Sequence, residues 1–260
     1  MVTIKTPEEI TLMREGGRIL ATVLGEVVAL VKPGVSTAVL EEHAVRRLKE
    51  LGAVSSFIGY RGKGNVPFPS SLCTSINEEI VHAPAIPGRV LTSDDIIGLD
   101  FGCRYPASSK GFYTDMAVTV GVGNVPEAAR RLMTVTRRSL QQGLKMVRPG
   151  NYIHDVSRAI QKFIHRYGFG IVREFVGHGV GYAIHEDPQI FNYYEAGQPR
   201  VEMKEGMCLA IEPMVTLGDH AVKVLPDGWT AVTKDGSLAA HFELTVVVTK
   251  SGYEILTRTN

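Results

Sequence analysis

The 260-residue sequence lacks several features that would place it in well-defined classes of protein. Its 28 Lys and Arg nearly cancel its 27 Asp and Glu, so no charge excess indicates binding to nucleic acid. No apolar run is long enough to cross a membrane, and the first residues carry acids where a signal peptide has an apolar core. We therefore expect a soluble, cytoplasmic protein with no membrane association and no evident nucleic-acid binding.

Cysteine is also scarce. The three cysteines, Cys73, Cys103 and Cys208, form no CxxC pair and are odd in number. This pattern disfavours both a disulfide framework and a structural zinc knuckle, so we expect reduced thiols. No Pro/Ser-rich linker divides the chain either, and we expect one domain over residues 1–260.

The sequence does contain an internal repeat. The phrase "VKPGVSTAVLEEHAVRRLKELGA" at 31–53 resembles "VRPGNYIHDVSRAIQKFIHRYGF" at 147–169. Two further pairs follow in the same order: "IIGLDFG" (96–102) with "CLAIEPM" (208–214), and "TDMAVTV" (114–120) with "FELTVVV" (242–248). Three matches in one order predict a duplicated αβ unit with a pseudo-two-fold axis, whose halves are about 6–122 and 123–260.

The local signals predict an α+β fold. Thr6, Pro7 and Glu9 are typical of a helix start, with a threonine cap and an acid three residues later, and this helix should reach about Val31. Each repeated V-basic-P-G phrase predicts a turn and then a helix closed by glycine. Strands such as "AVTVGV" and "LTVVVT" favour one antiparallel sheet, shared by both halves and covered by the helices on one side.

Each half places two carboxylates inside an apolar strand, Asp100 and Asp115 in the first and Glu212 and Glu243 in the second. Acids are rare in strand interiors unless they have a partner, although acids that face solvent at an edge are the alternative. Four buried carboxyl groups would have raised pKa values unless cations compensated them. Divalent metal is the natural compensation.

The stretch "FVGHGVGYAIHEDPQI" at 175–190 adds His178 and His185. Its glycines disfavour a helix, and the two side chains face one site only if the chain bulges or turns. The alternative is two histidines that are merely hydrogen-bonded in a glycine-rich loop. With the four carboxylates, His178 completes five ligands, enough for two metal ions that share oxygens. The oxygen-rich set suits Mn, Fe(II), Co or Zn, which leaves His82 and His185 as free imidazoles.

The order of these residues, with "GHGVGYAIHEDP", "IEPM" and "FELT", resembles methionine aminopeptidase type I, of the pita-bread fold, over essentially the whole chain. The resemblance implies a metallopeptidase in which Asp115 and Glu243 bridge two divalent metal ions. The remaining ligands it implies are Asp100, His178 and Glu212. It further implies that Glu212 takes part in general-base chemistry and that His185 steadies the scissile carbonyl.

The resemblance also implies a reaction, the metal-assisted hydrolysis that removes the N-terminal methionine of nascent proteins, with a small second residue preferred. His82 would contact the substrate near its N-terminus. The methionine side chain would lie in a pocket whose residues could otherwise be ordinary core: Tyr60, Phe68, Cys73 and Trp229. We expect a monomer; contact with the ribosome fits this function, but no basic patch in the sequence argues for it.

Several departures from the family pattern affect the expected shape of the pocket. The segments 61–71 and 101–114 are longer than usual and look like loop insertions. Ala83 follows His82 where glycine is common, and Ile184 precedes His185 where an aromatic residue is frequent. The short distance from His185 to Glu212 disfavours the type II enzymes.

Two rival hypotheses remain. Prolidase and aminopeptidase P share the fold and the metal carboxylates, but they normally carry an additional N-terminal domain, for which the helix at Thr6 leaves no room. A binding module could retain the pita-bread fold after its ligands were lost, and the complete ligand set argues against it.

Overall fold

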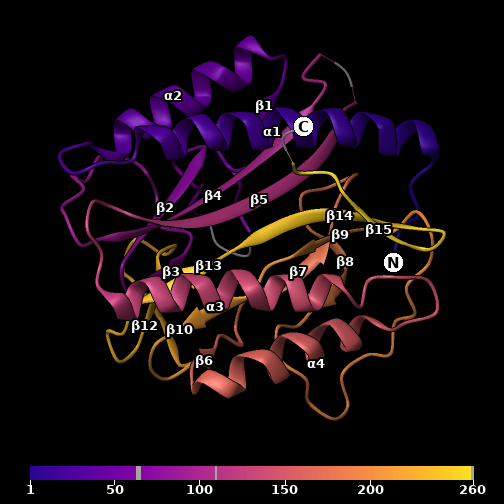
Figure 1. Ribbon diagram of the computed structural model, residues 1–260. Coiled ribbons are helices and arrows are strands. Elements are labelled where there is room, and N and C mark those ends of the chain that lie inside the picture. Colours follow the sequence, from indigo (N-terminus) through magenta and orange to yellow (C-terminus); the bar gives the residue numbers. More distant parts are fainter. Residues whose placement is uncertain (63–65, 109, 259–260) are drawn as a thin grey trace.

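Four long helices lie against one face of a curved sheet in the computed structural model, which describes residues 1–62, 66–108 and 110–258 (Figure 1). In chain order they are α1 (Pro7–Leu30), α2 (Thr37–Glu50), α3 (Glu127–Leu144) and α4 (Ile153–Ile164), the last continued by a short 3-10 turn at His165–Tyr167. Each pair of helices precedes strands of its own half, in the order that the repeat predicts.

The helix starts follow from local sequence. The Thr6 side chain accepts a hydrogen bond from the backbone N–H of Glu9, whose carboxylate accepts one from the backbone N–H of Thr6. Gly34 precedes α2 with φ +87°, and Gly150 precedes α4 with φ +85°. Because that left-handed backbone favours glycine, the two V-basic-P-G phrases form the same turn. The capping box predicted at Thr6 and Glu9 is confirmed.

The largest sheet has the strand order β1-β4-β5-β14-β9-β7-β8, with β2 paired to β4 and β15 to β14, and every pairing is antiparallel. Its strands are β1 (Val54–Ser55), β2 (Leu72–Ile76), β4 (Ile96–Tyr105), β5 (Phe112–Gly121), β7 (Gly177–Gly179), β8 (Glu186–Ile190), β9 (Cys208–Ile211), β14 (Glu243–Thr249) and β15 (Gly252–Ile255). The repeated strand phrases of the first half form β4 and β5, and those of the second half form β9 and β14, which lie beside them in the sheet. The α+β class and the antiparallel sheet are confirmed.

Two smaller sheets complete the fold. One has the order β13-β10-β6, formed by Ala239–His241, Met214–Thr216 and Gly170–Ile171, and the other has the order β11-β12-β3, formed by Val222–Val224, Ala231–Thr233 and Glu79–Val81. Because the large sheet takes strands from both halves, it supports one domain over 1–260, which stays a prediction.

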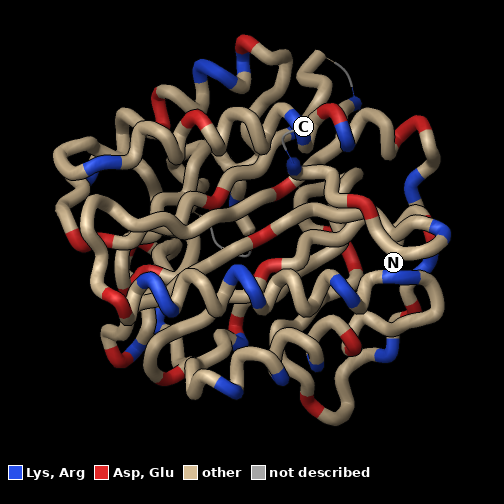
Figure 2. The backbone as a smooth tube through the Cα atoms, in the orientation of Figure 1, with Lys and Arg blue, Asp and Glu red and all other residues tan. Residues whose placement is uncertain are grey.

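The two faces of the central strands have different environments because side chains alternate along a strand. On β4, Leu99 and Phe101 pack into a core with Leu20 and Leu24 of α1. Asp100 lies between them in the sequence and therefore points to the opposite face. Figure 2 shows acidic positions in these central strands, behind the helices. The helices thus cover the apolar face and leave the carboxylates on the other.

The segment 101–114 is not a loop, so that expectation was wrong. Strands β4 and β5 pair without a break from Ile96–Gly121 to Tyr105–Phe112, and the segment mainly extends this hairpin. Its residue 109 lies outside the described part of the chain. Residues 63–65 of the segment 61–71 also lie outside it. The backbone N–H of Phe68 donates a hydrogen bond of 2.7 Å to the carbonyl oxygen of Tyr60.

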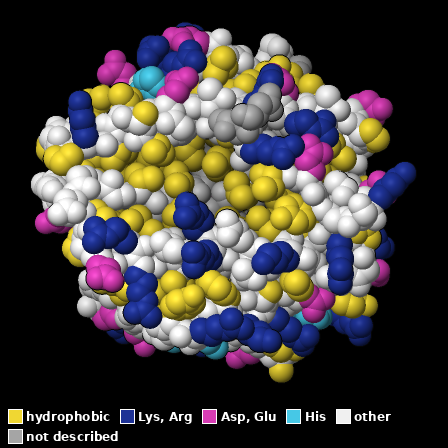
Figure 3. Space-filling view, viewed as in Figure 1, with side chains coloured by type: hydrophobic (Ala, Val, Ile, Leu, Met, Phe, Trp, Pro, Cys, Tyr) yellow, Lys and Arg dark blue, Asp and Glu magenta, His cyan; other side chains and the backbone are white. Residues whose placement is uncertain are grey.

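The fold gathers basic side chains that are dispersed in the sequence. The exposed faces of α3, α4 and their connection carry Arg130, Arg131, Arg137, Arg138, Lys145, Arg148, Arg158 and Lys162 (Figure 3). The acids of these two helices are Glu127 and Asp155. A basic surface therefore exists, which the sequence reading missed. Among the described helices, none is long and apolar enough to cross a membrane.

Candidate active site

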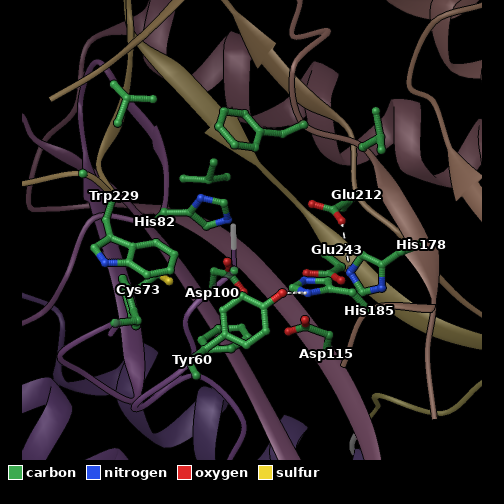
Figure 4. A pocket seen from close by; sticks show the side chains of 18 of the residues that line it. Tyr60, Cys73, His82, Asp100, Asp115, His178, His185, Glu212, Trp229 and Glu243 are labelled. Carbon is green, nitrogen blue, oxygen red and sulfur yellow. Dashed lines mark hydrogen bonds and ion pairs between the residues drawn. The ribbon is translucent and has the colours of Figure 1, made fainter. Parts of the chain in front are cut away.

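A cavity of about 610 Å³ opens on the face of the sheet away from the helices, and it brings the predicted site residues together (Figure 4). Its lining includes every candidate named from the sequence: Tyr60, Phe68, Cys73, His82, Asp100, Asp115, His178, His185, Glu212, Trp229 and Glu243. Eight of these residues lie in strands or directly at strand ends, Trp229 lies between β11 and β12, and Tyr60 and Phe68 precede β2, so only the folded sheet unites them.

The sheet register places three of the four carboxylates on one face. Ala117 of β5 pairs with Asp100 of β4 on one side and with Glu243 of β14 on the other. Asp115 is two residues from Ala117 and therefore shares that face. Glu212 follows the end of β9. All four side chains belong to residues at most 9% exposed, so the alternative of solvent-facing acids is wrong.

Burial raises the pKa of Asp100, Asp115, Glu212 and Glu243, and their mutual repulsion adds to this for Asp100, Glu212 and Glu243. No cationic side chain is among the residues that line the cavity, as far as the structure describes them. The buried oxygens Asp100 Oδ1 and Glu243 Oε1 have no hydrogen-bond partner. Such a cluster fits divalent cations, which would satisfy these oxygens and let the carboxyl groups ionise.

His178 presents one free nitrogen to the carboxylates. Its Nδ1 lies 3.0 Å from the carbonyl oxygen of Gly179, to which it donates, so Nε2 carries the lone pair. Nε2 lies 3.5 Å from Glu212 Oε1. Burial lowers the pKa of His178 to about 3, which keeps the ring neutral. A neutral, oriented imidazole is what a metal ligand requires.

Among the described residues, two groups of ligand atoms are compact enough to hold a metal ion, with all atoms of each group within 4.8 Å of one another. The first contains Asp115, His178 and Glu243, all of them predicted ligands. The second contains Glu212, His241 and Glu243. Glu243 belongs to both, in keeping with a bridging position. Asp100 lines the same cavity but belongs to neither group.

His241 is the residue near the carboxylates that the sequence reading missed. Its Nε2 is buried, lies 3.3 Å from Glu212 Oε2 and 4.0 Å from Glu243 Oε2, and has no well-aligned hydrogen bond. Burial lowers its pKa to about 3. His241 lies two residues before Glu243, at the end of β13, and this position was a signal from which it could have been identified.

His178 and His185 do face one site. A register shift in the β7–β8 pairing and the turn after Gly179 bring their ring centroids to 4.5 Å. The Tyr60 hydroxyl lies 2.8 Å from His185 Nδ1. Desolvation lowers the pKa of His185 and raises that of Tyr60, so both groups are neutral and the phenol can donate to Nδ1. Nε2 of His185 then carries the proton.

An aromatic wall lies beside the carboxylates. The Trp229 ring is 5.2 Å from that of Phe68 and 6.4 Å from those of Tyr60 and His82, measured between centroids. Phe57, Phe175 and four valines extend the apolar lining, and the sequence offered no signal that these residues belong to it. His82 has φ +61°, and burial lowers its pKa to about 4. The predicted pocket residues line this cavity, and their contact with a methionine side chain stays a prediction.

The comparisons with known proteins agree over almost the whole chain. The model of metallopeptidase family M24 matches residues 11–250. "Methionine aminopeptidase 1" of Bacillus subtilis is 46% identical over 99% of this chain and 100% of its own length. "Methionine aminopeptidase" of Escherichia coli is 40% identical over 98% and 94%.

Solved structures from both candidate families share the fold. The crystal structure of methionine aminopeptidase from Thermotoga maritima superposes with a TM-score of 0.92, at 43% identity, covering 99% of this chain and 100% of that one. A prolidase from Pyrococcus horikoshii shares the fold with a TM-score of 0.74, but at 18% identity and over 64% of its length. The predicted pita-bread fold is confirmed, and the chain belongs to metallopeptidase family M24 and, within it, to the methionine aminopeptidases.

Proposed function

We propose that the protein removes the N-terminal methionine from newly made proteins by hydrolysing their first peptide bond. One observation carries this proposal: a single cavity holds four buried carboxylates and an oriented imidazole beside an apolar pocket with aromatic and thiol walls. The first part fits a metal-dependent hydrolase, and the second fits an unbranched thioether.

Two divalent cations would be held by Asp100, Asp115, His178, Glu212 and Glu243. When bound, they supply positive charge that acidifies a water and polarises the scissile carbonyl. The oxygen-rich donor set with one imidazole suits Mn, Fe(II), Co or Zn. Glu212 lies in the carboxylate cluster next to the imidazoles of His178 and His241, where its carboxylate can accept a proton from the attacking water.

His185 and His82 act on the substrate in this proposal. His185 stands at the cavity wall with Nε2–H free, since the Tyr60 hydroxyl engages Nδ1, and it donates to the carbonyl oxygen as negative charge develops there. His82 stays neutral near pH 7 and contacts the substrate near its amino terminus. Trp229, Phe68, Tyr60 and Cys73 enclose the methionine side chain.

Protein N-termini are thus the substrate partners. We add three proposals that follow from this substrate class: action as a monomer, in the cytoplasm, with contact to the ribosome. The basic surface over α3 and α4 supports the last of these, because ribosomal RNA is a polyanion. Co-sedimentation with ribosomes that weakens steeply with salt would support it, and salt-independent sedimentation or none would contradict it.

A panel of tripeptides tests the function. Met-Ala-Ser, Met-Lys-Ser, Leu-Ala-Ser and Ala-Pro-Ser should be compared at one concentration with Mn present. We expect Met-Ala-Ser to be cleaved fastest and Met-Lys-Ser to be poor, because a small second residue is preferred. Leu-Ala-Ser should retain some cleavage, since hydrophobic pockets discriminate such neighbours by only about 1–3 kcal/mol. Faster cleavage of Ala-Pro-Ser than of Met-Ala-Ser would contradict the methionine assignment.

A further inference from the structure

The first residues of the chain reach the hairpin that carries both site histidines. Lys5 Nζ lies 2.7 Å from Glu186 Oε2, although the two residues are 181 positions apart. Their side chains are only 1% and 7% exposed. The Thr3 hydroxyl donates to the same carboxylate oxygen. A buried carboxylate needs such partners, so the N-terminal segment neutralises a charge inside the hairpin.

The other oxygen of Glu186 holds the turn of that hairpin. Glu186 Oε1 accepts hydrogen bonds from the backbone N–H groups of Tyr182 and Ala183, the latter at 3.0 Å. This turn joins β7, which contains His178, to β8, which begins directly after His185. One carboxylate therefore fixes the backbone between the two histidines.

Lys5 is itself fixed in place. Its backbone N–H donates to the carbonyl of Gly206 at 2.9 Å, and its ammonium lies 5.0 Å from the centre of the Tyr182 ring. Gly181 has φ +141°, and a Cβ there would lie 2.3 Å from Lys5 Cε. The hairpin thus closely encloses the lysine stem, and Lys5 contacts no residue of the metal cluster.

We propose that Lys5 is a positioning residue, which holds Glu186 as an ionised acceptor so that the turn at 182–183 keeps His185 aligned with the scissile carbonyl. The role of His185 rests on the function proposed above. Removal of the ammonium would leave the carboxylate buried and unpaired, and the turn would relax. His185 would lose its alignment, whereas the carboxylate cluster would still bind metal.

The test compares Lys5→Met, Lys5→Arg, Glu186→Gln and the double variant Lys5→Met/Glu186→Gln with the wild type on Met-Ala-Ser. The control is Arg14→Met, which removes another long-range ion pair of the N-terminal region, with Glu254, away from the hairpin. We expect Lys5→Met to lower kcat at least tenfold, with KM and metal content within twofold of the wild type. Lys5→Arg should retain more activity, and Arg14→Met should stay within twofold of the wild type.

The double variant separates positioning from a general loss of stability. Glutamine at position 186 keeps an acceptor for the two backbone N–H groups without a buried charge. We therefore expect the double variant to fold and to have a higher kcat than Lys5→Met. An unchanged kcat per folded molecule in Lys5→Met, with only a lower Tm, would overturn the proposal. The proposal would also be overturned if the fold-loss in kcat of the double variant equalled the product of the fold-losses of Lys5→Met and Glu186→Gln.

A second readout does not depend on peptidase activity. The imidazole NMR signals of His185, identified by their loss in His185→Ala, should shift or broaden in Lys5→Met, while those of the partly exposed His220, away from the hairpin, stay unchanged. Unshifted His185 signals would overturn the proposal. If the wild type fails to cleave Met-Ala-Ser while these signals respond, the proposed function fails and the positioning by Lys5 stands.

Discussion

Replacement of the two histidines of the β7–β8 hairpin should produce two different defects. His178 directs Nε2 at the carboxylates, with Nδ1 engaged by a backbone carbonyl, so His178→Ala removes a metal ligand. His185 has Nδ1 engaged by the Tyr60 hydroxyl and should donate through Nε2 to the substrate. His185→Ala should therefore keep its metal and lose a donor to the developing oxyanion.

The size of the His185 effect follows from its geometry. Loss of one oxyanion donor costs about 10²–10³ in kcat, or roughly 2.7–4 kcal/mol. Tyr60→Phe keeps the imidazole of His185 but removes the hydroxyl that selects its tautomer. Loss of such a hydrogen-bond partner should lower kcat about tenfold or somewhat more. The expected order of kcat is thus wild type, Tyr60→Phe, His185→Ala.

The assay is kcat and KM on Met-Ala-Ser at saturating Mn, with bound Mn measured by elemental analysis after gel filtration. His220→Ala, which alters a partly exposed histidine paired with Asp219, is the control and should match the wild type. Equal loss of metal in His178→Ala and His185→Ala would refute the assignment of their roles. A His185→Ala enzyme with full kcat would refute the oxyanion role.

Four further predictions concern the cavity. Chelation should abolish activity and lower Tm, because the carboxylates lose their cations, and addition of Mn, Co or Fe(II) should restore both. Full activity in verified metal-free protein would contradict this. In metal-free protein, burial raises the carboxyl pKa values, so above pH 6.5 the native state binds more protons than the unfolded state. Its free energy of unfolding should then fall as pH rises from 6.5 to 8, by up to ~1.4 kcal/mol per pH unit for each extra proton, as measured in urea. Lowering the pH below 6.5 protonates histidines of the unfolded state, which opposes this trend. His241→Leu should weaken Mn binding about 10-fold or more, because it removes the Nε2 that faces Glu212. His241→Gln should recover part of the affinity, and titration calorimetry measures both. Trp229→Ala should raise KM for Met-Ala-Ser with metal content unchanged, and a normal KM would remove Trp229 from the pocket.

The secondary structure near the repeats could be predicted because its causes are local. The capping residues Thr6 and Glu9 are three positions apart, and the glycines of both V-basic-P-G turns adopt a backbone that few other residues tolerate. The four carboxylates could be found for a similar reason, since an acid inside an apolar strand is improbable without a partner. The segment 101–114 was misjudged, because its extra length relative to the family pattern indicated an inserted loop, whereas the pairing of β4 with β5 makes most of it strand.

The sequence by itself thus determined the helices, the kind of strand and the chemistry of the ligands, all of which depend on residues close in the chain. Only the tertiary structure decided which side chains share a cavity. Ala117 stands between Asp100 and Glu243 because two strand registers coincide. His241 joins Glu212, and Lys5 reaches Glu186, through contacts between distant segments. Such contacts depend on sheet register and burial, which no local pattern of residues encodes.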